Sequence, residues 1–168
     1  MEVRELIKNN KHNPPEFWLG LRGISKLTSE GSWQLRVDLE DYEGRPYTAI
    51  YNTFWVEEES PYRLHISDFD PESTLQDSFQ GLDGMAFSTM DNDNDNSDMN
   101  CAETYLGGWW FDHCHLVNLN GYNFNEKSLA EKPENYATGI VWVNIIKKPY
   151  QNLYFSWPKV EMKVRRVL

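Results

Sequence analysis

The stretch FSTMDNDNDNSDMNCAETYLGGWWFDHCHLVNLNGYN, residues 87–123, gathers most of the chemically active side chains of this 168-residue chain. It contains both cysteines, two of the four histidines and two adjacent tryptophans. It also contains four aspartates within eight positions, namely Asp91, Asp93, Asp95 and Asp98. Such a combination is typical either of a solvated acidic loop beside an ordinary core or of a functional site.

The alternate spacing of the aspartates is compatible with a metal site. In a tight loop, carboxylates at alternate positions point at one centre, as hard Ca²⁺ requires. An EF-hand loop starting at Asp91 would need glycine and glutamate where this chain has Asn96 and Ala102, which excludes the EF-hand. A Ca²⁺ loop completed by backbone carbonyls stays open. The alternative is a solvated acidic turn, because Asn and Asp favour turns.

The composition excludes several classes of protein. The length suits one domain, and 40% hydrophobic with 14% aromatic residues favours a packed core over disorder. A net charge of −10 argues against a nucleic acid partner and favours a cation. The apolar runs are far shorter than the roughly 20 residues of a membrane span, and the opening MEVRELIKNN lacks a signal-peptide pattern. Either the signal peptide is missing from this chain or the protein stays inside the cell.

The thiols and imidazoles leave several chemistries open. Cys101 and Cys114 lie 13 positions apart, which is not the spacing of a zinc pair. A disulfide between them would contribute about 3 kcal/mol, but two buried free thiols agree equally well with the residues alone. Next to Cys114, His113 and His115 suggest metal or nucleophile chemistry. Neighbours on an extended chain point in opposite directions, which argues against an enzyme.

Aromatic residues flanked by glycines are the third feature of this region. Core packing accounts for at least one of the two adjacent tryptophans, whereas some of the tyrosines could line a shallow pocket for a sugar or an acetyl group. The set comprises Tyr105, Trp109, Trp110, Phe111, Tyr122, Tyr136 and Trp142.

Along the rest of the chain, apolar residues mostly recur at every second position. SWQLRVDLED, residues 32–41, alternates apolar and polar side chains and predicts a half-buried antiparallel strand. The same reasoning predicts strands within 47–56, 61–69 and 154–168, and helices within 16–30 and 73–81. Residues 1–15 are predicted to be a polar lead-in, and turn formers dominate residues 90–155. We therefore expect an α+β fold with an antiparallel central sheet, short helices and a loop-rich C-terminal subdomain.

Several stretches together closely resemble the fibrinogen C-terminal (fibrinogen-related) domain. FSTMDNDND, NCAETYLGGWW and CHLVNLNG match the signature of that family, and EFWLG, LRVDLEDYEGRPYTAIY, YATGIVW and VEMKVR follow it in the same order. The resemblance implies a partial domain over residues 16–168, with a central sheet region (16–85), a calcium and ligand-pocket subdomain (86–155) and a last strand (156–168). The usual N-terminal subdomain of the family is expected to be absent.

The resemblance also implies a function. It indicates a secreted, extracellular, Ca²⁺-binding recognition module without catalytic activity, of the kind used in innate defence. The implied calcium ligands are the side chains of Asp93 and Asp95 and the main chains of Ser97 and Met99. The resemblance further implies a Cys101–Cys114 disulfide, and a cis peptide bond before its second cysteine.

The resemblance suggests two branches that differ in ligand. Fibrinogen grips a positively charged peptide partly through aspartates at two places where this chain has Tyr105 and Ala137. Ficolin-like and tachylectin-like lectins carry uncharged residues there and bind N-acetyl groups, so we expect an acetylated carbohydrate or a cell-surface glycoprotein as the partner. The implied pocket consists of Tyr105, His113, Cys114, His115, Tyr136 and Ala137, closed by Tyr150 or Trp142. The alternative is an angiopoietin-like or tenascin-like module that recognises a protein receptor, and a homo-oligomer is compatible with either.

Overall fold

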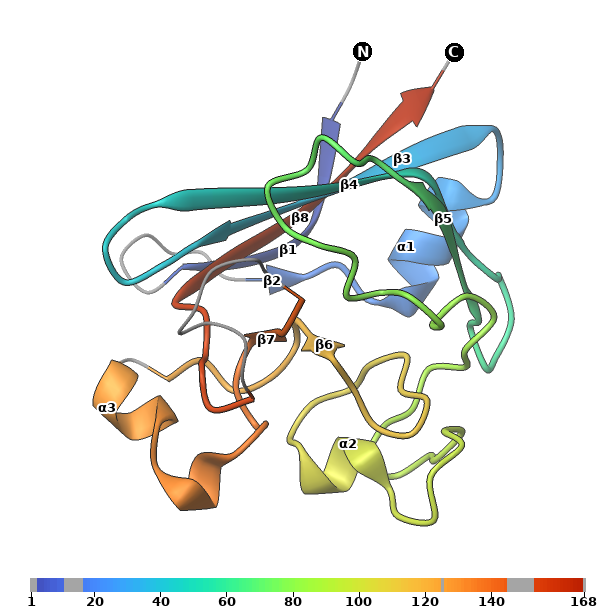
Figure 1. The fold of residues 1–168 in the computed structure, drawn as a ribbon. Coiled ribbons are helices and arrows are strands. Elements are labelled where there is room, and N and C mark those ends of the chain that lie inside the picture. Colours follow the sequence, from blue (N-terminus) through green and yellow to red (C-terminus); the bar gives the residue numbers. More distant parts are fainter. Residues whose placement is uncertain (1–2, 11–16, 125, 145–152, 168) are drawn as a thin grey trace.

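Six antiparallel strands form a sheet that lies above a loop-rich subdomain (Figure 1). The computed structural model describes residues 3–10, 17–124, 126–144 and 153–167. The strand order is β2-β1-β8-β3-β4-β5. These strands are β1 (Val3–Asn10), β2 (Phe17–Trp18), β3 (Ser32–Glu40), β4 (Pro46–Val56), β5 (Leu64–Phe69) and β8 (Lys159–Val167). The predicted α+β class is confirmed, as are strands within the four predicted segments.

The alternation of apolar and polar side chains along β3 determines which face of the sheet is buried. Leu35 and Val37 are fully buried, whereas Arg36 between them is exposed. On the neighbouring strand, Val164 pairs with Leu35 and Met162 pairs with Val37, and both are also fully buried. Because side chains alternate across a strand, the apolar set of several strands meets on one face, and the polar set is left on the other.

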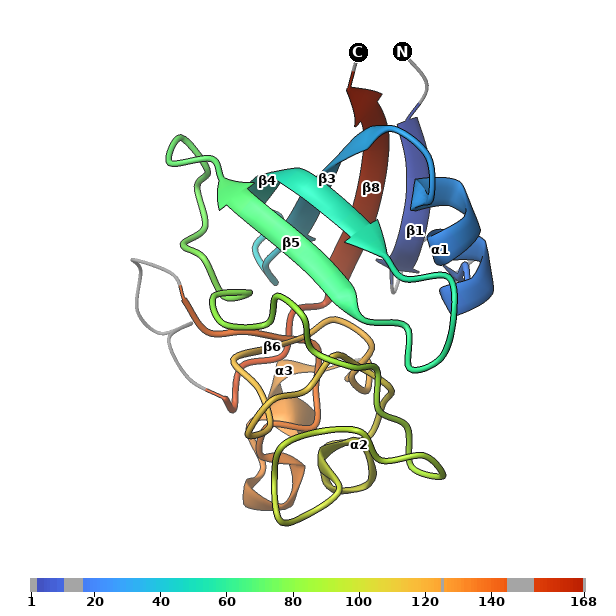
Figure 2. The ribbon, with the colours of Figure 1, turned by 90° about the vertical axis from the view of Figure 1, so that its right-hand side faces the viewer.

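The first residues of the chain correct the predicted lead-in. Val3–Asn10 forms β1, which pairs with β8 along its length and lies inside the sheet between β8 and β2. The strand begins beside the end of β8, where Val3 pairs with Arg165 (Figures 1 and 2). The sequence VRELIKNN has little apolar alternation, so its periodicity gave no signal. Backbone pairing to β8 and the complete burial of Leu6 hold it in place.

One of the two predicted helices is present. Helix α1 (Leu21–Thr28) lies within the predicted range, and Ile24 is fully buried against the sheet. Residues 73–81 form turns instead, so the helix predicted there is wrong. Their polar groups bond to the edge of β4, where the backbone N–H of Thr48 donates to the Thr74 hydroxyl at 2.7 Å and that of Leu75 donates to the Thr48 carbonyl at 3.1 Å.

Below the sheet, the subdomain contains only short elements joined by loops. They are α2 (Cys101–Thr104), β6 (Val117–Asn118), α3 (Lys127–Ala130), a 3₁₀ turn (Pro133–Asn135) and β7 (Val141–Trp142). Large aromatic side chains fill the space between the two layers. Trp109 and Trp110 are fully buried, and the ring of Phe79 contacts Tyr51 of the sheet and Trp109 of the subdomain. None of the helices in the described ranges is long and apolar enough to cross a membrane.

Candidate functional site

The acidic loop is held in shape by its own carboxylates. Asp93 Oδ1 accepts a hydrogen bond from the backbone N–H of Asp95 at 3.1 Å. Asp95 in turn accepts from the N–H of Ser97 at 2.9 Å and from that of Cys101 at 3.0 Å. The contacts to Asp95 and Ser97 are local Asx turns, and the contact to Cys101 closes the loop over six residues, which explains why a run of alternating Asp and Asn residues folds into a compact loop.

The same loop brings two carboxylates together. The pKa of Asp95 is raised, first by burial and then in part by the negative charge of Asp93, although backbone hydrogen bonds oppose the shift. A divalent cation would relieve this repulsion, and carboxylates with main-chain oxygens are the ligands that Ca²⁺ prefers. The described residues contain no cluster of three or more His, Cys, Asp or Glu side chains suited to a metal. A cation would therefore depend on Asp93, Asp95 and main-chain oxygens, for which the resemblance suggests Ser97 and Met99.

A disulfide joins Cys101, at the start of α2, to Cys114, with their Cα atoms 5.2 Å apart. This confirms the pairing that the resemblance implied. The expected cis peptide bond before Cys114 is wrong, since the cis bond among the described residues is Ser60–Pro61. Cys114 instead turns the chain with a φ of 64°, and its carbonyl accepts a hydrogen bond from the N–H of Asp112 at 3.2 Å.

A cavity of about 160 Å³ opens beside this turn. It is lined by Ser78, Gln80, Leu82, Asp112, His113, Cys114, His115 and Leu116. Three of the predicted pocket residues, His113, Cys114 and His115, are therefore brought together. The contribution of residues 78–82 was missed, because their segment was predicted to be a helix and only tertiary contacts bring it to the second cysteine.

His115 is the best-buried titratable group of this cavity. Its ring packs against Tyr105 and Phe111, with centroids 5.0 and 5.6 Å apart, and its Nε2–H donates to the Ala137 carbonyl at 3.1 Å. Burial lowers the pKa of His115 to about 4, so the ring is neutral at pH 7. With Nε2 carrying the proton, Nδ1 is an acceptor, and it is buried without a hydrogen-bond partner among the described residues.

His113 and Asp112 connect the cavity to the acidic loop. The side chain of His113 is 76% exposed, and its Nδ1 lies 3.2 Å from Asp112 Oδ1. The Asn96 amide of the acidic loop donates to the same oxygen at 2.7 Å. This hydrogen bond is the main reason that the pKa of Asp112 is lowered, and His113 adds to the effect. The Oδ1 atom of the cavity carboxylate is therefore already contacted by two side chains.

The remaining predicted pocket residues that the structure describes do not line the cavity. Ala137 is buried with a φ of 61° and reaches the site only through its carbonyl. Tyr136 is exposed, and its ring packs on Tyr154 at 4.7 Å without lining the cavity. Trp142 is 1% exposed and its Nε1–H donates to the Gln76 carbonyl, so its predicted role in closing the pocket is wrong. The other candidate for that role, Tyr150, lies outside the described residues.

The fold and the site together define the family. Residues 7–167 match the family described as "Fibrinogen beta and gamma chains, C-terminal globular domain". The chain belongs to this fibrinogen C-terminal domain family, whose domains are recognition modules. The match starts earlier than the predicted Glu16 and includes the second half of β1.

Individual relatives show the same relationship. The chain is 40% identical over 153 residues to techylectin-5A of Tachypleus tridentatus, covering 90% of this chain and 48% of that protein. The fibrinogen-like globe domain of human ANGPTL6 superposes with a TM-score of 0.84 at 29% identity, covering 98% of this chain and 78% of the other. Lamprey fibrin D-dimer in complex with the peptide Gly-His-Arg-Pro-amide gives a TM-score of 0.73 at 30% identity, covering 91% of this chain and 52% of the other. The chain thus spans about half the length of the techylectin.

Proposed function

We propose that this chain is an extracellular, Ca²⁺-dependent recognition module that binds the N-acetyl group of a sugar in the cavity beside Cys114. The observation that carries the proposal is the state of His115. Its neutral ring lies between two aromatic side chains, and its Nδ1 is an acceptor without a protein partner. An acetamide offers the matching groups, namely an N–H donor and a small methyl group that suits the apolar side chains of Leu82 and Leu116 in the lining.

The charge of the cavity favours a neutral ligand. A peptide with a positively charged N-terminus needs an unpaired carboxylate, whereas Asp112 already accepts from Asn96 and lies beside His113. The two positions where fibrinogen is expected to carry aspartates hold uncharged Tyr105 and Ala137. A cavity of about 160 Å³ suits one small group better than several side chains of a peptide.

The expected cation would act on the shape of the pocket. When bound, Ca²⁺ would neutralise Asp93 and Asp95 and hold the acidic loop in one conformation. Asp95 bonds to Cys101, and Asn96 bonds to Asp112 in the cavity. An ordered loop would therefore hold Asp112 at the start of the turn that presents His113 and His115, and would hold Cys114 within that turn through its disulfide to Cys101.

The test is calorimetric titration with N-acetylglucosamine, first with Ca²⁺ and then with a chelator. We expect binding with Ca²⁺ that weakens strongly in chelator and is reduced by His113→Ala, since this exposed side chain lines the cavity. His65→Ala is the matched control, because His65 stacks on Trp55 of the sheet, outside the cavity lining. Absence of binding in both conditions would refute the lectin assignment.

A protein partner is the second candidate, and exposed apolar side chains in and beside the acidic loop favour it. Met90, Met99 and Leu106 are 62%, 50% and 46% exposed. Exposed methionines are common on surfaces that bind proteins. A chain that gains thermal stability from Ca²⁺ but binds no acetylated sugar would support this candidate over the lectin.

A further inference from the structure

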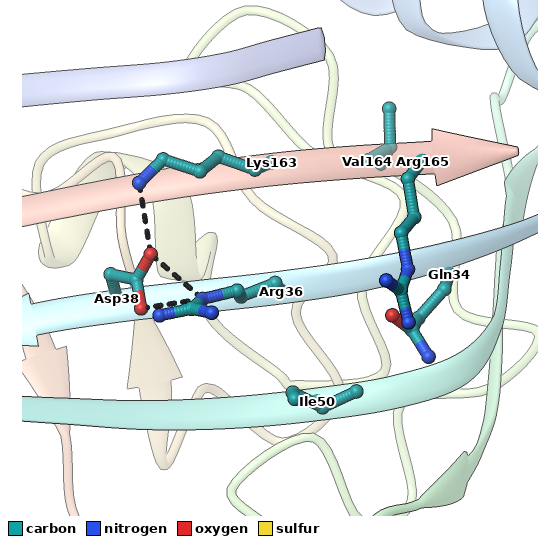
Figure 3. A pocket seen from close by; sticks show the side chains of 7 residues that line it. All are labelled: Gln34, Arg36, Asp38, Ile50, Lys163, Val164 and Arg165. Carbon is teal, nitrogen blue, oxygen red and sulfur yellow. Dashed lines mark hydrogen bonds and ion pairs between the residues drawn. The ribbon is translucent and has the colours of Figure 1, made fainter. Parts of the chain in front are cut away.

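The outer face of the sheet carries a second cavity, of about 400 Å³. It is lined by Gln34, Arg36, Asp38, Ile50, Lys163, Val164 and Arg165, which belong to β3, β4 and β8 (Figure 3). None of these residues lines the cavity beside Cys114. The two cavities are therefore built from different segments of the chain.

The strand register explains why these side chains meet. Arg36 on β3 pairs with Lys163 on β8 and with Ile50 on β4. One step along the same face, Gln34 pairs with Arg165. Diagonal neighbours in an antiparallel pair lie roughly 7–8 Å apart, so Arg36 and Arg165 start from neighbouring positions of one face. The Arg36 guanidinium lies on the side of Asp38 and the Arg165 guanidinium lies beside Gln34, so a small group bound between them would be within reach of both long side chains (Figure 3).

The balance of charge in the outer cavity is positive, although the whole chain carries −10. Three cations line it, and Asp38 is the one acidic residue among them. Asp38 accepts hydrogen bonds from Arg36 Nε at 2.8 Å and from Lys163 Nζ at 2.9 Å, and Lys163 also forms an ion pair with Glu161.

Two guanidinium groups are left with free donors. Arg36 contacts Asp38 through Nε, so its two terminal nitrogens have no partner among the described side chains. Arg165 forms no ion pair with any side chain that the structure describes, and Figure 3 shows it extending from β8 toward Gln34 on β3. Guanidinium donors recognise carboxylate and sulfate groups with fixed geometry.

We propose that this outer cavity binds the carboxylate or sulfate group of an acidic sugar unit. Arg165 and the terminal nitrogens of Arg36 hold the oxyanion, and Ile50 contacts the apolar face of the sugar ring. The acidic residues Asp38 and Glu161 continue the same face along the strands. They would repel a ligand with many negative charges, such as an acidic peptide, and favour one oxyanion on an otherwise neutral ring.

The experiment uses probes without an acetyl group, so that it does not depend on the cavity beside Cys114. Methyl glucuronide and glucose 6-sulfate are titrated into the protein at low salt and followed by NMR, with methyl glucoside and inorganic sulfate as comparisons. We expect both acidic sugars to bind and to shift the signals of β3 and β8, while methyl glucoside does not. Arg165→Gln should weaken binding about tenfold, because a charge-assisted hydrogen bond is lost.

Arg166→Gln is the matched control, since Arg166 is the next residue of β8, is also exposed and projects from the opposite face. It should bind as the unaltered protein does. Three results would overturn the proposal: no binding of either acidic sugar, an equal loss in both arginine variants, or inorganic sulfate binding as tightly as glucose 6-sulfate. Failure of N-acetylglucosamine binding would leave this test unaffected.

Discussion

Asp95 Oδ2 accepts a hydrogen bond from the backbone N–H of Cys101 at 3.0 Å, so the acidic loop is tied directly to the disulfide. A second tie runs from the Asn96 amide to Asp112, two residues before Cys114. Both half-cystines are thus connected to the loop that we expect to hold Ca²⁺. We therefore expect order in the loop to be transmitted through these contacts to the turn that presents His115.

The first prediction concerns the cation. Asp93→Ala should lower the melting temperature in Ca²⁺ but change it little in chelator, because a ligand that binds only the folded state stabilises it by mass action. With Ca²⁺ at 100 times its dissociation constant this stabilisation is about 2.7 kcal/mol, or roughly 5–10 °C in a domain of this size. Thermal unfolding in the two buffers measures the difference.

Asp98→Ala serves as the control for this prediction, since Asp98 is exposed and belongs to the same loop but is not an expected side-chain ligand. It should keep the full response to Ca²⁺. An equal loss of stability for Asp93→Ala in both buffers would count against Asp93 as a ligand.

The second prediction concerns the disulfide. Replacing Cys101 and Cys114 together by alanine should lower the free energy of unfolding by about 3 kcal/mol, because the unfolded chain regains the freedom of the closed loop. Urea unfolding with and without reductant measures the effect, and reductant should destabilise only the unaltered protein. Two thiols that react with an alkylating agent before reduction would contradict the bridge itself.

Regular strands were predictable because their signal is local. The alternation around Leu35 and Val37 marks a strand with one buried face, and nothing distant is needed to interpret it. β1 lacks that alternation and becomes a strand through its pairing with β8. The segment around Thr74 has a helix-like sequence pattern, but its polar groups bond to the edge of β4. In both cases a tertiary partner, absent from the local sequence, decides the structure.

The candidate site was predictable only where residues are close in sequence. His113, Cys114 and His115 meet in one cavity because they are consecutive. Ser78 and Leu82 line the same cavity from more than thirty positions away and carry no chemical signal. The outer cavity could not be found from any motif either, because Arg36 and Arg165 meet only through the register of β3 with β8.

The third prediction concerns the turn between β3 and β4. The buried Asp41 carboxylate accepts hydrogen bonds from the backbone N–H of Glu43 at 3.0 Å and of Arg45 at 2.9 Å, and from the Tyr47 hydroxyl at 3.2 Å. Asp41→Ala would remove an acceptor from each donor and should cost about 3 kcal/mol in the free energy of unfolding. Urea unfolding measures the loss. Glu43→Ala, at an exposed position of the same turn, should change stability far less, and an equal effect of both variants would refute this role of Asp41.

The last prediction concerns pH. Burial lowers the pKa of His115 from 6.5 to about 4, although the hydrogen bond to the Ala137 carbonyl partly opposes this shift. Above pH 6.5 the ring is neutral in both the folded and unfolded states, so its contribution to stability does not change there. As the pH falls from 6.5 toward 4, the His115 ring binds a proton in the unfolded chain but stays neutral in the folded chain. Stability should therefore decrease over this range by up to about 3 kcal/mol.

Urea unfolding between pH 8 and pH 4 measures this loss, and comparison with His115→Gln separates it from the titration of carboxylates. The variant should show a shallower decrease even if it is less stable at every pH. An NMR titration that places the midpoint of the His115 ring near 6.5 would contradict both the burial argument and the neutral acceptor on which the proposed acetyl recognition depends.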